Sequence, residues 1–166
     1  MAEFQQNLWA PWRLEYLGNI TEARAACFLC AYRDDPAADA KNWVCFRRTR
    51  CFGVLNRFPY STGHLLISPL DHQCELAALP DETLNEIILS IRDATRSLRE
   101  MLRCEGFNVG INLGSCAGAG LPGHLHWHIV PRWTGDTNFM PVIGDVKVIP
   151  EVLTRIHERF VATWKT

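Results

Sequence analysis

The sequence lacks the features that mark membrane, exported and nucleic-acid-binding proteins. No apolar run approaches the about 20 residues that a membrane-spanning helix needs. Residues 1–16 carry Glu3, Arg13 and Glu15 where a secretion signal would be continuously apolar. The formal net charge is −1, so the chain offers no general positive surface for a nucleic-acid polymer. We therefore expect a cytoplasmic protein without membrane or nucleic-acid partners, although a local group of donors could still hold a small anion.

The cysteines form no regular framework, and their number, seven, is odd. Without an export signal, a reducing compartment is expected, in which cysteines are free thiols or metal ligands. The length of 166 residues, with 48% hydrophobic and 21% charged residues, suits one globular domain. No internal repeat or low-complexity segment divides the chain, so a single domain is expected over residues 1–166.

The apolar pattern predicts an α+β fold in which strands and helices are mixed. Strands are expected at 51–56 and 64–68, around turn residues 59–63, and again at 107–113 and 125–131. A long helix should begin after Pro80 and end by Gly106, and a shorter amphipathic helix should cover 151–164. Residues 33–42 favour a loop or short helix. The apolar stripe of the long helix comprises Leu84, Ile87, Ile88, Ile91, Leu98 and Met101.

Three of the six histidines, His124, His126 and His128, alternate with apolar residues. Alternate side chains of a strand share one face, so the three imidazoles should point the same way, with Cα atoms ~6–7 Å apart. One metal ion could bind two of these rings, but all three only if the chain bends. A structural histidine strand and a catalytic metal site are therefore alternatives to a direct chemical role.

The segment before the histidines favours phosphate chemistry. Residues 112–120 are rich in glycine and other small residues, which let main-chain N–H groups approach an anion. They do not match the Walker pattern, because no Lys-Ser/Thr pair ends them. An imidazole with its ordinary pKa of ~6.5 is largely neutral near pH 7 and can attack phosphorus to form a P–N bond. A second, protonated imidazole could stabilise the phosphoryl oxygens.

At these residues the chain resembles the histidine triad (HIT) superfamily, whose motif alternates three histidines with apolar residues. Residues 55–59 and 63–69, with His72, resemble the upstream hairpin of that family. Residues 10–13, 128–133 and 135–139 resemble its branch of diadenosine tetraphosphate phosphorylases and hydrolases. The resemblance implies a HIT-like, mostly antiparallel sheet with a core at about 27–132, an N-terminal arm and a C-terminal extension. It also implies a homodimer that cleaves dinucleoside polyphosphates through a covalent nucleotidyl-histidine.

The resemblance also implies a role for each matching residue. His126 would attack the α-phosphate, His128 would contact phosphate oxygens, and His124 would complete the triad. Asn56 would hold ribose hydroxyls, Leu55 would lie near the base, Asn112 would contact phosphate, and His64 would support the site. The implied nucleotide-binding residues are Leu55, Asn56, His64, Asn112, Gly118 and Gly120. Many relatives have Gln and Ser or Thr where this chain has Gly120 and Leu121, so the leaving-group contacts should differ. A divalent cation such as Mg²⁺ is expected to accompany the substrate.

Cys27 and Cys30 form a Cys-x-x-Cys pair. Two incidental thiols or a redox pair would explain it, but a tetrahedral zinc site needs two further ligands. The resemblance implies His72 and His124 as those ligands, in a structural Cys2His2 zinc site that ties the N-terminal arm to the histidine strand. The other five cysteines, at 45, 51, 74, 104 and 116, are interpreted as core or surface thiols, and His157 as a surface residue.

Three other functions use the same residues. A nucleoside phosphoramidate hydrolase would break a P–N bond of the substrate with the same histidines. A nucleotide-binding module would bind the same ligand without meaningful catalysis. A zinc-dependent hydrolase would attack with a metal-bound water instead of an imidazole.

Overall fold

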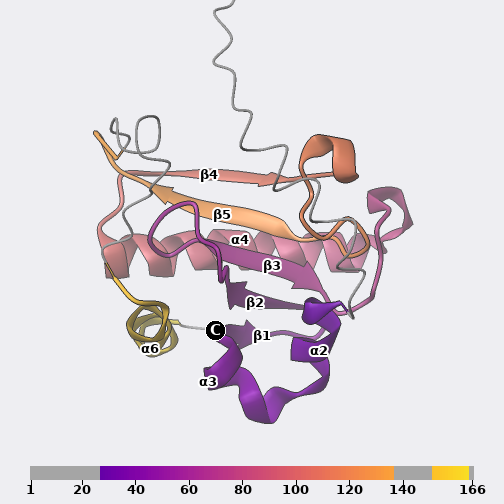
Figure 1. The fold of residues 1–166 in the computed structure, drawn as a ribbon, viewed down its shortest axis with the longest axis horizontal. Helices are drawn as coiled ribbons and strands as arrows, with labels where there is room; N and C mark the ends of the chain where they lie inside the picture. Colours follow the sequence, from indigo (N-terminus) through magenta and orange to yellow (C-terminus); the bar gives the residue numbers. More distant parts are fainter. Residues whose placement is uncertain (1–26, 137–150, 165–166) are drawn as a thin grey trace, which may run out of the picture.

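The computed structural model describes residues 27–136 and 151–164, and its centre is one antiparallel sheet. The strand order is β1-β2-β3-β5-β4 (Figure 1). The strands are β1 (Val44–Arg47), β2 (Cys51–Leu55), β3 (Leu65–Pro69), β4 (Gly106–Ile111) and β5 (Trp127–Arg132). The expected α+β architecture is confirmed. The expected resemblances at residues 10–13 and 137–139 lie outside the described residues.

The β2–β3 hairpin follows from its sequence. Both strands are fully buried, and Leu55 pairs with Leu65 where the chain turns. Gly63 closes that turn with φ +76°, and a Cβ there would lie 2.5 Å from Leu102 Cδ1. A residue with a side chain would therefore be strained in this turn.

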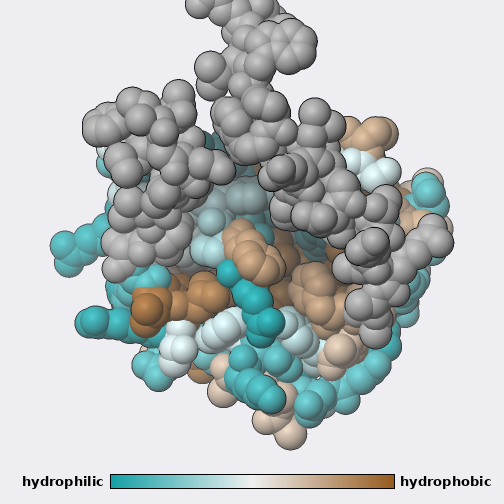
Figure 2. Space-filling model, in the orientation of Figure 1, coloured by the Kyte–Doolittle hydropathy of each residue, from teal (hydrophilic) through white to brown (hydrophobic). Residues whose placement is uncertain are grey.

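The two faces of the sheet bury different sets of residues. In the β3–β5 pair, Leu65 faces Ile129 and Leu66 faces His128. Leu65 and Ile129 pack with α4 (Asp81–Leu102), whereas Leu66 packs with Leu29 of α2 (Phe28–Asp34). His128 therefore lies on the face opposite α4, which runs behind the sheet in Figure 1. Figure 2 shows this face, where apolar residues form a band crossed by a hydrophilic strip.

Helix α4 confirms the predicted long helix, with two corrections. Ile87 and Leu98 are fully buried, but Ile88 is 59% exposed and lies outside the buried stripe. The helix ends at Leu102, because Arg103 adopts a left-handed conformation with φ 53° and donates its N–H to the carbonyl of Arg99. Gly106 is not the stop, since it begins β4. A left-handed non-glycine residue makes this end of the helix more strained than a glycine would.

Helix α6 (Leu153–Thr163) corrects the prediction for His157. The helix packs against β1 and α4 through Ile156 and Phe160, which are buried. His157 is also buried, with 8% exposure, and its Nε2 donates to the carbonyl of Val44 at 2.8 Å. The ring is therefore an anchor between α6 and β1 and not a surface group.

The connections contain only short helices. The segment 33–42 is helical, with the end of α2, η1 (Pro36–Ala38) and α3 (Asp39–Asn42). Two further 3-10 turns, η2 (Leu76–Ala78) and η3 (Ser115–Ala117), lie before α4 and in the glycine-rich loop. Among the residues described, no helix has both the length and the apolar character needed to cross a membrane.

Candidate active site and metal centre

The alternation predicted that the three histidines would share one strand, but only His128 lies in β5. Strand β5 begins at Trp127, so His124 and His126 precede it. The rings of His126 and His128 are neighbours, with centroids 5.1 Å apart. The ring of His124 instead lies beside Cys27 and Cys30, because Pro69 and the two thiols hold it there. Only His126 and His128 are thus brought together as a reactive pair.

His126 is held as a neutral imidazole with a free lone pair. Its Nδ1 lies 2.8 Å from the main-chain carbonyl oxygen of His124. A carbonyl can only accept, so Nδ1 carries the hydrogen and Nε2 keeps the lone pair. The residue is 7% exposed, and this burial lowers the pKa of His126 despite the hydrogen bond to His124. Nε2 is therefore available as a nucleophile at neutral pH.

His64 holds His128 in the tautomer opposite to that of His126. Nε2 of His64 lies 2.9 Å from Nδ1 of His128, while Nδ1 of His64 accepts the main-chain N–H of Tyr60 at 3.0 Å. His64 therefore donates to His128, whose own hydrogen must then lie on Nε2. Burial first, and the charge of His126 second, lower the pKa of His128 to about 4. The second imidazole is thus a neutral donor and not the protonated ring expected from the sequence.

The asparagines implied for nucleotide binding are both tied to their own loops. Asn56 Oδ1 accepts the N–H of Phe58 at 2.9 Å, and its Nδ2 lies 3.2 Å from His64 Nδ1. Asn112 Nδ2 donates to the carbonyl of Gly118 at 3.4 Å. The glycine-rich loop turns at Gly118, whose φ is +88°, and Gly120 is exposed. Leu55 is 2% exposed, and its side chain packs in the core with residues of α4.

Cys27, Cys30, His72 and His124 converge, as predicted for a metal site. Their ligand atoms all lie within 4.8 Å of one another, and no other such group occurs in residues 27–136 and 151–164. Nδ1 of His124 is 3.2 Å from Cys27 Sγ, and Nδ1 of His72 is 3.2 Å from Cys30 Sγ. Tetrahedral zinc with Zn–S of about 2.3 Å and Zn–N of about 2.0 Å places S and N about 3.5 Å apart. The separations therefore fit zinc.

The second nitrogen of His124 supports this fit. Nε2 donates to the carbonyl of Pro69 at 3.0 Å, which leaves the lone pair on Nδ1 facing the thiols. Burial lowers the pKa of His124 to about 4, so the ring stays neutral and able to bind a metal. Burial and the neighbouring Cys27 raise the pKa of Cys30, so a metal would have to displace its proton.

Comparison with known proteins agrees with this geometry. A sequence model of the HIT domain matches residues 38–135. The chain belongs to the HIT family. It is 37% identical over 164 residues to an AP-4-A phosphorylase from Mycobacterium tuberculosis, which covers 96% of this chain and 84% of that protein. An adenosine 5'-monophosphoramidase from Candida albicans is 25% identical over 66% of this chain and 72% of its own length.

A solved structure confirms the HIT fold. The Zn-bound histidine triad family protein from Mycobacterium smegmatis superimposes with a TM-score of 0.64 at 24% identity, over 81% of this chain and 92% of that protein. The predicted family and the predicted α+β fold are both confirmed.

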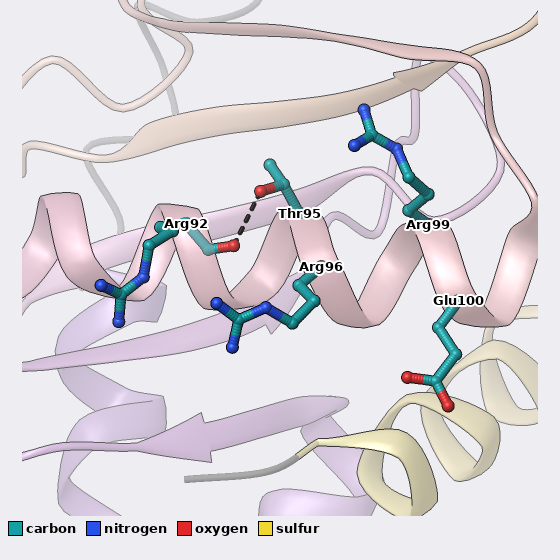
Figure 3. A pocket seen from close by; sticks show the side chains of 5 residues that line it. All are labelled: Arg92, Thr95, Arg96, Arg99 and Glu100. Atoms are coloured by element: carbon teal, nitrogen blue, oxygen red, sulfur yellow. Dashed lines mark hydrogen bonds between the residues drawn. The ribbon is translucent and has the colours of Figure 1, made fainter.

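A hollow on the outer side of α4 is a separate feature of this HIT-family chain. It is lined by Arg92, Thr95, Arg96, Arg99 and Glu100. Figure 3 shows Arg92, Arg96 and Glu100 on one side of the helix, whereas Arg99 points to the opposite side. Arg92 pairs with the Asp93 carboxylate at 2.9 Å, and Arg48 pairs with it at 2.6 Å. Arg48 and Arg92 thus form an ion-pair network around Asp93, on the helix that covers the face opposite the histidines.

Sequence reasoning missed one residue of the HIT site, Tyr60. Its ring lies 4.6 Å from the ring of His64 and 5.8 Å from that of His128, measured between centroids. Its main-chain N–H fixes the ring of His64. An aromatic residue in the turn 59–63, four positions before His64, was the available indication.

Proposed function

We propose that this chain is a nucleotidyl hydrolase or transferase that cleaves dinucleoside polyphosphates through a covalent nucleotidyl-His126. The observation that carries the proposal is the arrangement of two ring nitrogens. His126 has its hydrogen on Nδ1, which donates to the His124 carbonyl, so Nε2 holds a lone pair. His128 has its hydrogen on Nε2. A nucleophile beside a neutral donor suits attack on a phosphoryl group.

The proposed reaction has two steps. Nε2 of His126 bonds to the α-phosphorus, the P–O bond to the bridging oxygen breaks, and the polyphosphate leaves with that electron pair. The N–H of His128 donates to an oxygen of the transferring group as charge shifts onto it. In the second step an oxygen nucleophile attacks the same phosphorus, loses its proton to solvent, and returns the electron pair to His126.

The acceptor in the second step decides the class of enzyme. Because a similar chain from Mycobacterium tuberculosis is named a phosphorylase, we propose phosphate as the acceptor. Diadenosine tetraphosphate should then give two nucleotides, ADP and ATP, only when phosphate is added. A hydrolase would instead give AMP and ATP in phosphate-free buffer.

We further propose roles for the residues around the histidines. His64 supports His128, and Asn112, Gly118 and Gly120 shape the loop that receives the phosphates. Asn56 and the main chain of Leu55 border the nucleoside. Phosphorothioate substrate with known stereochemistry tests the covalent step, because two displacements retain the configuration at phosphorus and one inverts it.

A phosphoramidate hydrolase is a second candidate, favoured by the similarity to a monophosphoramidase from Candida albicans. It would use the same first step with an amine as leaving group. Competition between adenosine phosphoramidate and diadenosine tetraphosphate ranks the two substrates by kcat/KM. Binding of either without turnover would instead indicate a nucleotide-binding module.

We propose that the Cys27, Cys30, His72 and His124 cluster holds structural Zn²⁺. The donor set, the separations and the second hydrogen bond of His124 support this, as does the Zn-bound relative from Mycobacterium smegmatis. His126 and His128 are not part of the cluster, which argues for chemistry at the imidazole and not at a metal-bound water. A divalent cation such as Mg²⁺ would enter with the polyphosphate.

We also propose a homodimer in the cytoplasm. Strand β4 is an edge of the sheet, and Val109 on it is 46% exposed, so this edge is suited to pairing with a second copy. None of the seven cysteines forms a disulfide, as a reducing compartment requires. Sedimentation equilibrium tests the dimer: a mass of one chain at micromolar concentration would contradict it.

A further inference from the structure

The loop between β2 and β3 fixes the orientation of the Asn56 amide. Oδ1 lies 2.9 Å from the main-chain nitrogen of Phe58. A main-chain N–H can only donate, so the atom that faces it must be the oxygen of the amide. The amide nitrogen therefore faces His64, at 3.2 Å from Nδ1. Asn56 is thus a donor to a buried histidine.

Two donors meet at Nδ1 of His64. The first is Asn56 Nδ2, and the second is the main-chain N–H of Tyr60 at 3.0 Å. A ring nitrogen that faces two donors keeps its lone pair, so the hydrogen of the neutral ring lies on Nε2. His64 is 1% exposed, and burial disfavours the charged ring that could hold hydrogens on both nitrogens.

The same argument extends to His128. The contact of 2.9 Å between His64 Nε2 and His128 Nδ1 places a hydrogen on the former and a lone pair on the latter. His128 Nε2 then carries the remaining hydrogen. This atom is buried and has no hydrogen-bond partner among the described residues. A buried donor without an acceptor is unfavourable, so the site is prepared for an acceptor such as a phosphoryl oxygen.

We propose that Asn56 is a positioning residue that fixes the tautomers of His64 and His128, so that His128 presents an N–H to the reacting group. This role differs from the ribose contact that the family resemblance implies for Asn56. It rests on the proposed function only for the identity of the group that accepts from His128.

The test replaces Asn56 by Asp. The carboxylate has nearly the same shape and still accepts from Phe58 N–H, but it faces His64 Nδ1 as an acceptor and draws a hydrogen there. Long-range ¹H–¹⁵N spectra of the substrate-free protein, purified with its bound metal, report which ring nitrogens are protonated. His128→Gln assigns the His128 signals by their loss. We expect unprotonated Nδ1 in both rings of the wild type. In Asn56→Asp we expect the hydrogen of His64 on Nδ1, which leaves its Nε2 as an acceptor and moves the hydrogen of His128 from Nε2 to Nδ1.

Turnover of diadenosine tetraphosphate provides the second measurement. Loss of an aligned donor to a transition state costs on the order of 10²-fold in kcat. We expect a fall of that size in Asn56→Asp, with KM changed by less than about threefold. The matched control is Asn85→Asp on the exposed side of α4, which makes the same chemical change away from the histidines. It should alter neither the spectra nor kcat.

Three results would overturn the proposal. One is a protonated His64 Nδ1 in the wild type, a result that does not depend on whether any variant folds. Another is an unchanged tautomer in Asn56→Asp. The third is a rise in KM with kcat unchanged, because that would assign Asn56 to substrate binding. The spectra require no substrate, so they test the tautomers even if the protein does not cleave dinucleoside polyphosphates. Failure of the proposed function would instead be seen as absence of turnover by the wild type.

Discussion

The main-chain carbonyl of His124 accepts a hydrogen bond from Nδ1 of His126 at 2.8 Å, while the ring of His124 lies 3.2 Å from Cys27 Sγ. One residue therefore belongs to two clusters, its ring to the thiols and its carbonyl to the nucleophile. A shift of this short segment would move His126 away from His128. The thiol cluster is thus expected to control the geometry of the reactive pair without taking part in the reaction.

The double variant Cys27→Ser, Cys30→Ser tests this relationship. We expect one zinc ion per wild-type chain and none in the variant, measured by metal analysis. Loss of metal-binding free energy would lower Tm, by about 2–4 °C for each kcal/mol lost. The kcat should fall as well, because the carbonyl of His124 is no longer held in place. Cys74→Ser, at an exposed thiol, is the control that should retain zinc, Tm and kcat.

Burial of His128 predicts a loss of stability in acid. Its pKa is lowered to about 4, whereas an unfolded chain titrates near 6.5. The unfolded state therefore binds more protons between these two pH values. The free energy of unfolding keeps its full value above pH ~6.5 and falls as the pH drops toward 4. The full shift corresponds to about 3 kcal/mol, which solvent screening reduces to about 2 kcal/mol.

Urea unfolding of the wild type and of His128→Gln between pH 4 and pH 7 measures this contribution. The variant lacks the titrating ring. Between pH 7 and pH 4 its free energy of unfolding should therefore fall by about 2 kcal/mol less than that of the wild type. Parallel profiles for the two proteins would show that His128 titrates normally in the folded state.

The end of α4 predicts a stabilising substitution. Arg103 is exposed and has φ 53°, a conformation that costs a residue with a side chain roughly 1 kcal/mol relative to glycine. Arg103→Gly should therefore raise the free energy of unfolding by about 0.5–1 kcal/mol. Gly106→Ala, at the start of β4, is the comparison and should bring no such gain. A destabilised Arg103→Gly would indicate that the arginine side chain matters more than its backbone.

The burial of His157 predicts a large effect far from the reactive histidines. His157→Ala removes the hydrogen bond to the Val44 carbonyl and leaves a space between α6 and β1. We expect a loss of about 2–3 kcal/mol and a fall in Tm of about 4–12 °C. Glu158→Ala, at the next and exposed position of α6, should change Tm by little. Equal Tm values for the two variants would contradict the anchoring role.

Local pattern was sufficient for much of the fold. The β2–β3 hairpin and the start of α4 were predicted within a residue or so, because apolar runs and turn residues determine them locally. Strand β1 was not predicted, since four residues carry little periodicity and its place depends on pairing with β2. Ile88 fits the helical stripe but is exposed, because the helical period alone does not determine how wide a face of the helix becomes buried.

The site was predictable in composition and less so in geometry. Alternation correctly placed His126 and His128 beside each other, but it could not show that Pro69 and two thiols draw His124 away. Those contacts cross more than fifty positions of the sequence. His157 was assigned to the surface for the same reason, because its acceptor on Val44 lies 113 positions away. Tautomers likewise depend on which main-chain donors the fold brings to each ring.

Rapid-quench mass spectrometry of the enzyme with diadenosine tetraphosphate tests the central claim most directly. The account predicts a transient species that carries one added AMP on the peptide containing His126, formed before product release and absent from His126→Gly. The His126→Gly protein should keep its circular dichroism spectrum and zinc content. Wild-type turnover with no such adduct at any quench time, together with inversion of configuration at the α-phosphorus, would contradict it.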